Sequence, residues 1–470
     1  MKLFDFSKFK SRIFQYLAAL AANLGMLSIG LHYGWPSSAI SVLKSGEYSF
    51  KMTEEEISWM IAVTPMGSVI GDVIAGFSMN IFGRKKMIWF SAIPLTVSWI
   101  LIAVANSSGY LFAGRIIAGI VDGLLFTAIP PYLAEISDPE IRGFLGTTYL
   151  VTLVFGMLMS NVMLYFISIP AQAYIAGSVT LVMMIILPFL PESPYFYLLR
   201  SEVALAKESL QKFRGKGEVD DEIGRISKGI MEEEKYAKGG LKELFLKPQY
   251  RNCLFLALSM TSLQQLSGIL GIQSYCQEVF QETSDIIDPK VANLIYYLLY
   301  FLATLVALVL IDISGRKPLV LFSSVVVCIT LFTISAYSYI KNSTHIDLSG
   351  YEYIQIVAIL VYICAYSIGL NCVPILVSSE IFPSHIKSKA FCVINLCYSV
   401  VSTSVVKYFS WSASTFSLAV PFFTFAIFSF ASVIILSIFL PETKGKTLED
   451  VQLQMRSNKL KKLEKNNYVI

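Results

Sequence analysis

The sequence predicts an all-α integral membrane protein with twelve transmembrane helices in two six-helix bundles and a short cytoplasmic helical domain. Composition is the first observation: of 470 residues, 55% are hydrophobic and 15% charged, whereas soluble domains carry about 25% charged residues. The second is twelve apolar runs, each near the roughly 20 residues that cross a bilayer. The third is a polar stretch over residues 191–252 that separates the runs six and six.

The first bundle is expected over residues 13–190, after a basic tail over residues 1–12. Its first apolar run is too long for the apolar core of a cleavable signal peptide. Glycine or proline next to charge separates several of the later runs, as in Gly83-Arg84-Lys85. The six runs cover residues 13–34, 56–81, 87–106, 110–133, 145–168 and 172–190.

Residues 191–252 are expected to form the cytoplasmic domain. Charged and apolar residues recur there at helical spacing over residues 202–213 and 221–236, and glycines interrupt them. Short amphipathic helices are therefore predicted, with a soluble linker as the alternative.

The second bundle is expected over residues 253–440, before a basic tail over residues 441–470. All seven cysteines lie in or at the ends of its apolar runs, without the spacing of a metal site or of a disulfide framework, and they are expected to pack as small apolar side chains. The six runs cover residues 253–276, 291–311, 318–340, 354–379, 389–411 and 414–440.

Orientation follows from the lysines and arginines. Most of the 37 lie on the side that holds both tails and residues 191–252, and the positive-inside rule places that side in the cytoplasm. A multi-pass plasma-membrane protein is expected. Asn342-Ser343-Thr344 then lies in a short external loop, and Asn342 is a candidate glycosylation site.

Three motifs occur once in each half, in the same order. Two related bundles follow, with a substrate site near the membrane midplane between them. The pairs are Gly83-Arg84-Lys85 with Gly315-Arg316-Lys317, Glu135 near Arg142 with Glu380 near Lys387, and Pro191-Glu192 with Pro441-Glu442.

Gln264 and Gln265 lie side by side about halfway along the run 253–276. Two primary amides facing lipid would each cost several kcal/mol, so they should face protein or a watery cavity. An amide donates and accepts hydrogen bonds without charge, which suits a neutral, hydroxyl-rich ligand. The alternative is that both amides bond a neighbouring helix.

Together these motifs resemble the sugar porter branch of the major facilitator superfamily, and within it the insect facilitated trehalose and glucose transporters. The resemblance covers nearly the whole chain and implies the major facilitator fold, alternating access and sugar hydrogen-bonded by Gln264 and Gln265. It rests on Gly76 to Lys85, Gly114-Arg115, Pro131 to Gly143, Pro191-Glu192-Ser193-Pro194, Gln264-Gln265-Leu266-Ser267-Gly268, Asp312 to Lys317 and Pro441-Glu442-Thr443-Lys444-Gly445.

Several positions where the family has pocket residues differ here. Leu270 and Tyr300, for example, replace asparagines of the family pattern. Side chains that could supply hydrogen bonds to a sugar instead are Asn161, Gln273, Tyr275, Tyr300 and Asn371. Ordinary helix packing is the alternative for each.

Charged residues of the repeated motifs are candidates for a cytoplasmic gate. In the family arrangement Arg84, Arg142, Arg316 and Lys387 lie near Glu135, Glu192, Glu380 and Glu442. Arginine–carboxylate pairs are strong and directional, and pairs formed across the bundles would close the inner side. The alternative is that the charges only end helices at the membrane surface.

Three charges lie deeper: Asp72, Arg115 and Asp122. Acids inside a membrane are functional candidates, and two close carboxylates would permit a proton-linked step. Helix 1 has Pro36 and Ser37 where proton-coupled sugar porters have aspartate, which favours facilitated diffusion.

The predicted function is facilitative transport of a small neutral sugar, trehalose or hexose, or of a polyol. The alternatives are a proton-coupled symporter and a non-transporting sugar sensor with the same fold. An enzyme is not expected: there is no phosphate loop, no nucleophile–base pairing and no metal spacing among the three histidines. No cofactor, metal or nucleic-acid partner is expected, and a monomer is the default.

Overall fold

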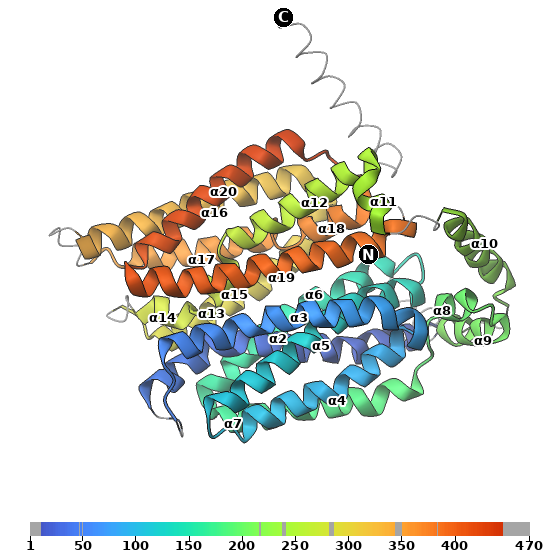
Figure 1. The fold of residues 1–470 in the computed structure, drawn as a ribbon, viewed down its shortest axis with the longest axis horizontal. Helices are drawn as coiled ribbons and strands as arrows, with labels where there is room; N and C mark the ends of the chain where they lie inside the picture. The colour runs from blue at the N-terminus through green and yellow to red at the C-terminus, as the bar shows by residue number, and fades with distance from the viewer. Residues whose placement is uncertain are drawn as a thin grey trace, which may run out of the picture. The chain divides into compact units, whose positions relative to one another are not determined.

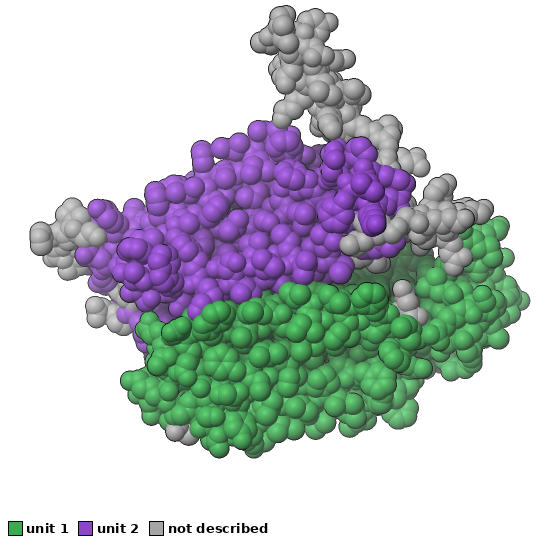
Figure 2. Space-filling model, viewed as in Figure 1, with its two compact units in different colours: residues 1–235 green, residues 236–470 purple. Residues whose placement is uncertain are grey.

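A computed structural model describes residues 11–444 except 47, 49, 216–217, 237–240, 282–285, 344–349 and 383. Every regular element in this part of the chain is a helix. Twelve helical spans there are long and apolar enough to cross a membrane, as the sequence predicts. The chain divides into two compact units, residues 1–235 and 236–470 (Figure 2).

Unit 1 contains six long helices followed by short ones (Figure 1). They are α2 (Ile13–Ser45), α3 (Glu54–Phe82), α4 (Arg84–Ala103), α5 (Ser108–Ile136), α6 (Arg142–Phe166), α7 (Ile169–Ile186), the 3-10 turn η1 (Leu187–Phe189), α8 (Pro194–Leu199), α9 (Val203–Arg214) and α10 (Asp220–Tyr236).

Unit 2 also contains six membrane spans, and two of them are interrupted helices. Its elements are α11 (Leu241–Leu246), α12 (Pro248–Leu266), α13 (Ile269–Ser274), α14 (Cys276–Gln281), α15 (Pro289–Ser314), α16 (Arg316–Ser343), α17 (Tyr353–Ile368), α18 (Val373–Ile381), α19 (Ser384–Thr415) and α20 (Ala419–Phe439).

The first helix is longer than its apolar run indicates. The prediction ended that run at residue 34, before Pro36, but α2 continues to Ser45 with Pro36 inside it. Proline is tolerated within membrane helices because neighbouring groups satisfy the freed carbonyl. Proline is therefore no boundary signal here.

Glycines bring the helices of unit 1 into close contact. On α3, a Cβ added at Gly71 would overlap the carbonyl oxygen of Ile120 on α5. A Cβ at Gly30 of α2 would overlap the carbonyl oxygen of Leu153 on α6 in the same way. Backbones approach this closely only where side chains are absent, so these glycines set the α3–α5 and α2–α6 packing.

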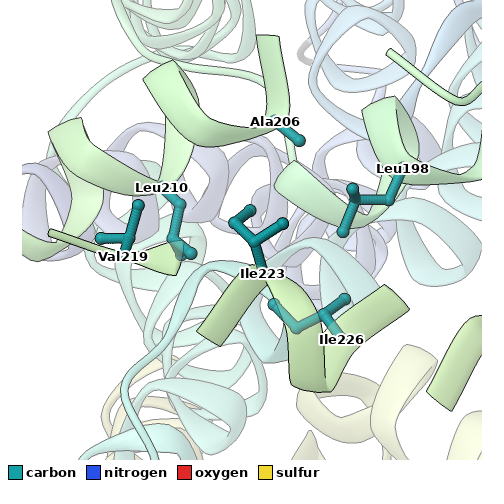
Figure 3. Close-up of a cluster of buried hydrophobic side chains, with 6 residues drawn as sticks. All are labelled: Leu198, Ala206, Leu210, Val219, Ile223 and Ile226. Carbon is teal, nitrogen blue, oxygen red and sulfur yellow. The ribbon is translucent and has the colours of Figure 1, made fainter. Parts of the chain in front are cut away.

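The helices after η1 form a small apolar core of their own (Figure 3). Two of them, α9 and α10, correspond to the predicted amphipathic segments 202–213 and 221–236. Their apolar faces meet because each has apolar residues at helical spacing. The buried members are Leu198, Ala206, Leu210, Val219, Ile223 and Ile226.

Candidate functional site

The paired amides lie at a helix break. We expected them near the middle of one helix, but α12 ends at Leu266 and the next helix begins at Ile269. Gly268, between these two helices, has φ +85°, and a Cβ added there would overlap the Phe425 ring. Glycine adopts this left-handed conformation without strain, so the break puts Gln264 and Gln265 in the last turn of α12.

A second break lies opposite the first. Residues 369–372 separate α17 from α18, and the carbonyl oxygen of Asn371 accepts a hydrogen bond of 3.3 Å from Gln264 Nε2. Gln265 Oε1 accepts one of 3.1 Å from the Ser402 hydroxyl of α19. Both amides are almost fully buried. Each therefore has at least one bond to a neighbouring segment, as the packing alternative requires, and further hydrogen-bonding atoms beyond it.

Tyrosines gather around these amides. Tyr300 of α15 is buried and interacts with Tyr362 and Tyr398, and Tyr366 lies within hydrogen-bonding reach of Gln264. The Tyr362 hydroxyl donates to the carbonyl oxygen of Ser267 at 3.2 Å. Tyr300 was a predicted site residue. The other tyrosines were not, because their sequence positions do not reveal which helix faces meet.

Two further candidates follow the first break. Gln273 is buried in α13, and its carbonyl oxygen accepts a 2.9 Å hydrogen bond from Tyr297. Tyr275 is buried and stacks on Phe409 with ring centroids 5.4 Å apart. These two residues and Asn371 thus lie in unit 2 with the paired amides, and their contact with a sugar stays a prediction.

Asn161 lies in unit 1 and joins two helices there. Its amide donates to the carbonyl oxygens of Gly34 (3.1 Å) and Met157 (2.9 Å), and its oxygen accepts from Ser38 (2.7 Å). This is the helix-packing alternative, since the bonds tie α6 to α2.

The repeated charges of unit 2 cap a helix. Glu442 accepts hydrogen bonds from the backbone N–H groups of Arg316 (3.1 Å) and Lys317 (3.0 Å), in the first turn of α16. Burial would raise the pKa of Glu442, but these and other backbone N–H donors hold it below the usual value. Arg316 donates to Glu380 at 2.9 Å, and Glu380 also accepts from Thr443.

Unit 1 repeats this arrangement. Glu192 accepts from the backbone N–H groups of Lys85 (2.9 Å) and Lys86 (3.3 Å) in the first turn of α4. Arg84 pairs with Glu135 at 3.1 Å, and Ser193 donates to Glu135. A carboxylate at a helix N-terminus is favoured by its free N–H groups and the helix dipole. The repeat in sequence is therefore a repeat of hydrogen bonds.

Arg84 and Glu135 both lie in unit 1, and Arg316 and Glu380 both lie in unit 2, so each of these two ion pairs joins helices within one unit. Arg142 is exposed at the start of α6 and lies near Tyr195, and Lys387 is half-buried in the first turn of α19. Their role in a gate stays a prediction.

The three deep charges lie within unit 1. Asp122 accepts a 2.8 Å hydrogen bond from Tyr33, and Asp72 accepts one of 3.1 Å from Thr127. Arg115 donates to the carbonyl oxygen of His32 at 2.5 Å. All three charged side chains are buried.

Asn342 is exposed near the end of α16. Thr344 of its sequon lies outside the described residues, so glycosylation stays a prediction.

One ion-pair network was missed by sequence reasoning. Arg214 of α9 bonds Asp138 (2.8 Å) and Glu222 (2.7 Å), and Arg12 bonds Asp138 (2.7 Å) and Glu140 (2.8 Å). The network ties the start of α2 and the α5–α6 loop to α9 and α10. The Arg12–Asp138 and Arg12–Glu140 pairs join residues that are 126 and 128 positions apart, so no local spacing indicates them.

A sequence profile of the family described as "Sugar (and other) transporter" matches residues 17–454. The chain belongs to this family. It is 30% identical to the facilitated trehalose transporter Tret1 of Bombyx mori over 444 residues, which are 94% of this chain and 87% of that relative. It is 31% identical to Tret1 of Polypedilum vanderplanki over 443 residues, 94% of this chain and 88% of that relative.

Solved structures have the same fold. The proton:xylose symporter XylE bound to 6-bromo-6-deoxy-D-glucose matches with TM-score 0.77 and 22% identity, over 95% of this chain and 100% of that one. Inward-open XylE from E. coli matches with TM-score 0.75 over 94% and 99% of the two chains. The predicted major facilitator fold and membership of a transporter family, not an enzyme family, are confirmed.

Proposed function

We propose that this protein carries trehalose or a hexose down its concentration gradient by alternating access. The observation that carries the proposal is the pair of buried glutamines at the break of α12, in a chain of the sugar transporter family. The relatives named above are trehalose transporters, and a broken membrane helix is where such carriers bind solute.

The chemistry around the amides suits a neutral sugar. Amides and tyrosine hydroxyls both donate and accept hydrogen bonds, as do the hydroxyls of a sugar. Tyrosine rings such as Tyr300 and Tyr366 also offer apolar faces for the C–H side of a sugar ring. A charged solute would need a side chain of opposite charge in the site. None of the side chains named above around Gln264 and Gln265 is a charged residue.

We also propose a place and orientation. The protein is proposed to lie in the plasma membrane, and the excess of lysine and arginine on one side supports an orientation with both termini in the cytoplasm. The functional unit is taken as a monomer.

Facilitated transport is favoured over proton symport. Pro36 lies in α2 where proton-coupled porters have aspartate, and the relatives are named facilitated transporters. A symporter is the second candidate because of the buried acids Asp72 and Asp122.

Uptake in cells that lack sugar transport tests the proposal. Labelled trehalose, glucose, fructose and a polyol are supplied with and without an uncoupler. Saturable uptake of one sugar, equal in both conditions, is expected. Loss of uptake with the uncoupler would identify a symporter. No uptake, with protein detected at the surface, would favour the sensor.

Gln264→Ala and Gln265→Ala are each expected to weaken sugar affinity about tenfold, because one hydrogen bond to a ligand contributes on the order of 1 kcal/mol or more. The measurement is the half-saturating sugar concentration of uptake, corrected for surface level. The matched control is Gln172→Ala. Gln172 is also a buried amide, and it bonds Ser160 at 2.7 Å.

The control variant should lose stability and surface level while its affinity stays unchanged. Unchanged affinity in both Gln264→Ala and Gln265→Ala would remove these amides from the site and leave helix packing as their role.

A further inference from the structure

A cluster of charged and polar side chains is buried between α2, α3 and α5, apart from the amide site. Asp72, Asp122 and Arg115 have exposed fractions of 6%, 3% and 2%. The two acids lie at one helix crossing, since a Cβ on Gly123 would approach the backbone nitrogen of Asp72 to 2.6 Å. They are close enough to interact electrostatically.

The charges of this cluster do not balance. Fully ionised, the two acids and Arg115 sum to one negative charge. From α2 the cluster is faced by Tyr33 and His32. His32 stacks on Trp99 with ring centroids 3.8 Å apart, and Arg115 donates to the His32 carbonyl oxygen, so a protonated His32 would place two positive charges side by side.

The other packed helices bring no charge to this depth. The charged residues of α4 are Arg84, Lys85 and Lys86 in its first turn, that of α6 is Arg142 at its start, and α7 has none. The tyrosines of α6 and α7 are Tyr149, Tyr165 and Tyr174. An uncompensated charge buried in a membrane costs several kcal/mol, so the cluster should bind one positive charge.

Hydrogen bonding indicates where the imbalance lies. Asp122 Oδ2 accepts from Tyr33, but Asp122 Oδ1 is buried and has no hydrogen-bond partner among the described residues. The Arg115 guanidinium does not supply one: its Nη1 bonds a backbone carbonyl, and its Nε also lacks a partner in the described part. A buried ionised carboxylate is rarely left with a bare oxygen.

We propose that the Asp72–Asp122 pair holds one proton in the folded protein and is a proton-binding site separate from the sugar site. With one carboxyl neutral, the other carboxylate balances Arg115. The unfolded chain, whose carboxyls lie in water, does not hold this proton near neutral pH.

The consequence is a stability that depends on pH with a defined sign. Because the folded state holds more protons than the unfolded state, stability falls as the pH rises. An asparagine at either position is a neutral replacement of the protonated carboxyl. The folded variant therefore no longer needs to bind a proton at this site.

Thermal unfolding of the purified, detergent-solubilised protein tests this between about pH 6 and pH 9. The Tm of the unmodified chain should fall by about 2–3 °C across this range. Asp72→Asn and Asp122→Asn should each flatten the profile. The matched control is Asp221→Asn, the same chemical change at an exposed position of α10, which should keep the falling profile.

The double variant Asp72→Asn/Asp122→Asn leaves Arg115 without a counter-charge and should lower the Tm at every pH. If one single variant does not fold, the other makes the same prediction. A flat profile in the unmodified chain, or a falling one in both single variants, would overturn the proposal. So would a Tm raised by Na⁺ at high pH in the unmodified chain alone, because the bound charge would then be a metal ion.

These measurements do not depend on the sugar proposal, since they need no transport. Uptake of sugar by the same variants separates the two proposals. Uptake that is absent at every pH while the Tm profiles behave as stated would refute the sugar proposal alone. Active uptake with flat Tm profiles would refute the proton site alone.

Discussion

Replacing Gly71 by alanine is expected to prevent most of the protein from folding. The added Cβ would overlap the carbonyl oxygen of Ile120, and a helix backbone cannot yield as a flexible side chain can. Overpacking of a well-packed core typically costs about 1–3 kcal/mol, and here two membrane helices must separate. We expect a several-fold loss of monodisperse protein in size-exclusion chromatography and a lower Tm.

Gly76→Ala is the matched control, five residues further along the same helix. Gly76 is exposed, and a Cβ there would meet nothing within 4 Å. Alanine favours helix over glycine by about 1 kcal/mol, so this variant should be as stable as the parent or more so. Equal behaviour of the two variants would contradict the close packing of α3 on α5.

Removing the carboxylate of Glu380 is expected to slow transport about tenfold while sugar affinity changes little. Glu380→Ala removes the carboxylate that pairs with Arg316, whose side chain is only 13% exposed, and it removes the acceptor of the Thr443 hydroxyl. Isolating one member of a partly buried pair costs about 1–3 kcal/mol. Under alternating access, the Arg316–Glu380 pair must also rearrange or form new pairs in either the inward-open or the outward-open state. Loss of the pair then changes the equilibrium between these two states.

A double-mutant cycle with Arg316→Gln separates gating from stability. Removing both charges leaves no unbalanced arginine charge at this position, so Glu380→Gln/Arg316→Gln should recover surface level and Tm relative to Glu380→Gln. If the pair controls the conformational change, turnover stays low in the double variant. Turnover that recovers together with stability, or normal turnover in Glu380→Ala, would reduce these charges to a structural role.

The repeated motifs show how far a sequence pattern reaches. Pro191-Glu192 and Pro441-Glu442 were recognised as equivalent from their order alone, and both glutamates cap the helix that begins after Gly83 or Gly315. Which groups pair was not predictable. Glu442 binds backbone N–H groups more than 120 residues away, and backbone donors have no sequence signature.

The burial of the paired amides follows the sequence prediction, but the geometry around them does not. Hydropathy placed Gln264 and Gln265 in a membrane helix. The cost of exposing amides to lipid then predicted that they face protein or a watery cavity. It did not reveal the break after Leu266, because Ser267-Gly268 is also compatible with a continuous helix. The break, the facing carbonyl of Asn371 and the surrounding tyrosines depend on contacts between helices distant in sequence.

The sequence by itself determined the membrane class, the twelve spans, the internal repeat and the family. The hydrocarbon core requires long apolar runs, which can be read from the sequence. The repeat can be recognised because the same motifs follow the same order in both halves. Only the tertiary structure decided where α12 breaks, which glycines pack α3 on α5, and that Asp72, Asp122 and Arg115 share one buried cluster. Those features arise where separate helices meet, and the spacing of residues along one helix does not specify its neighbours.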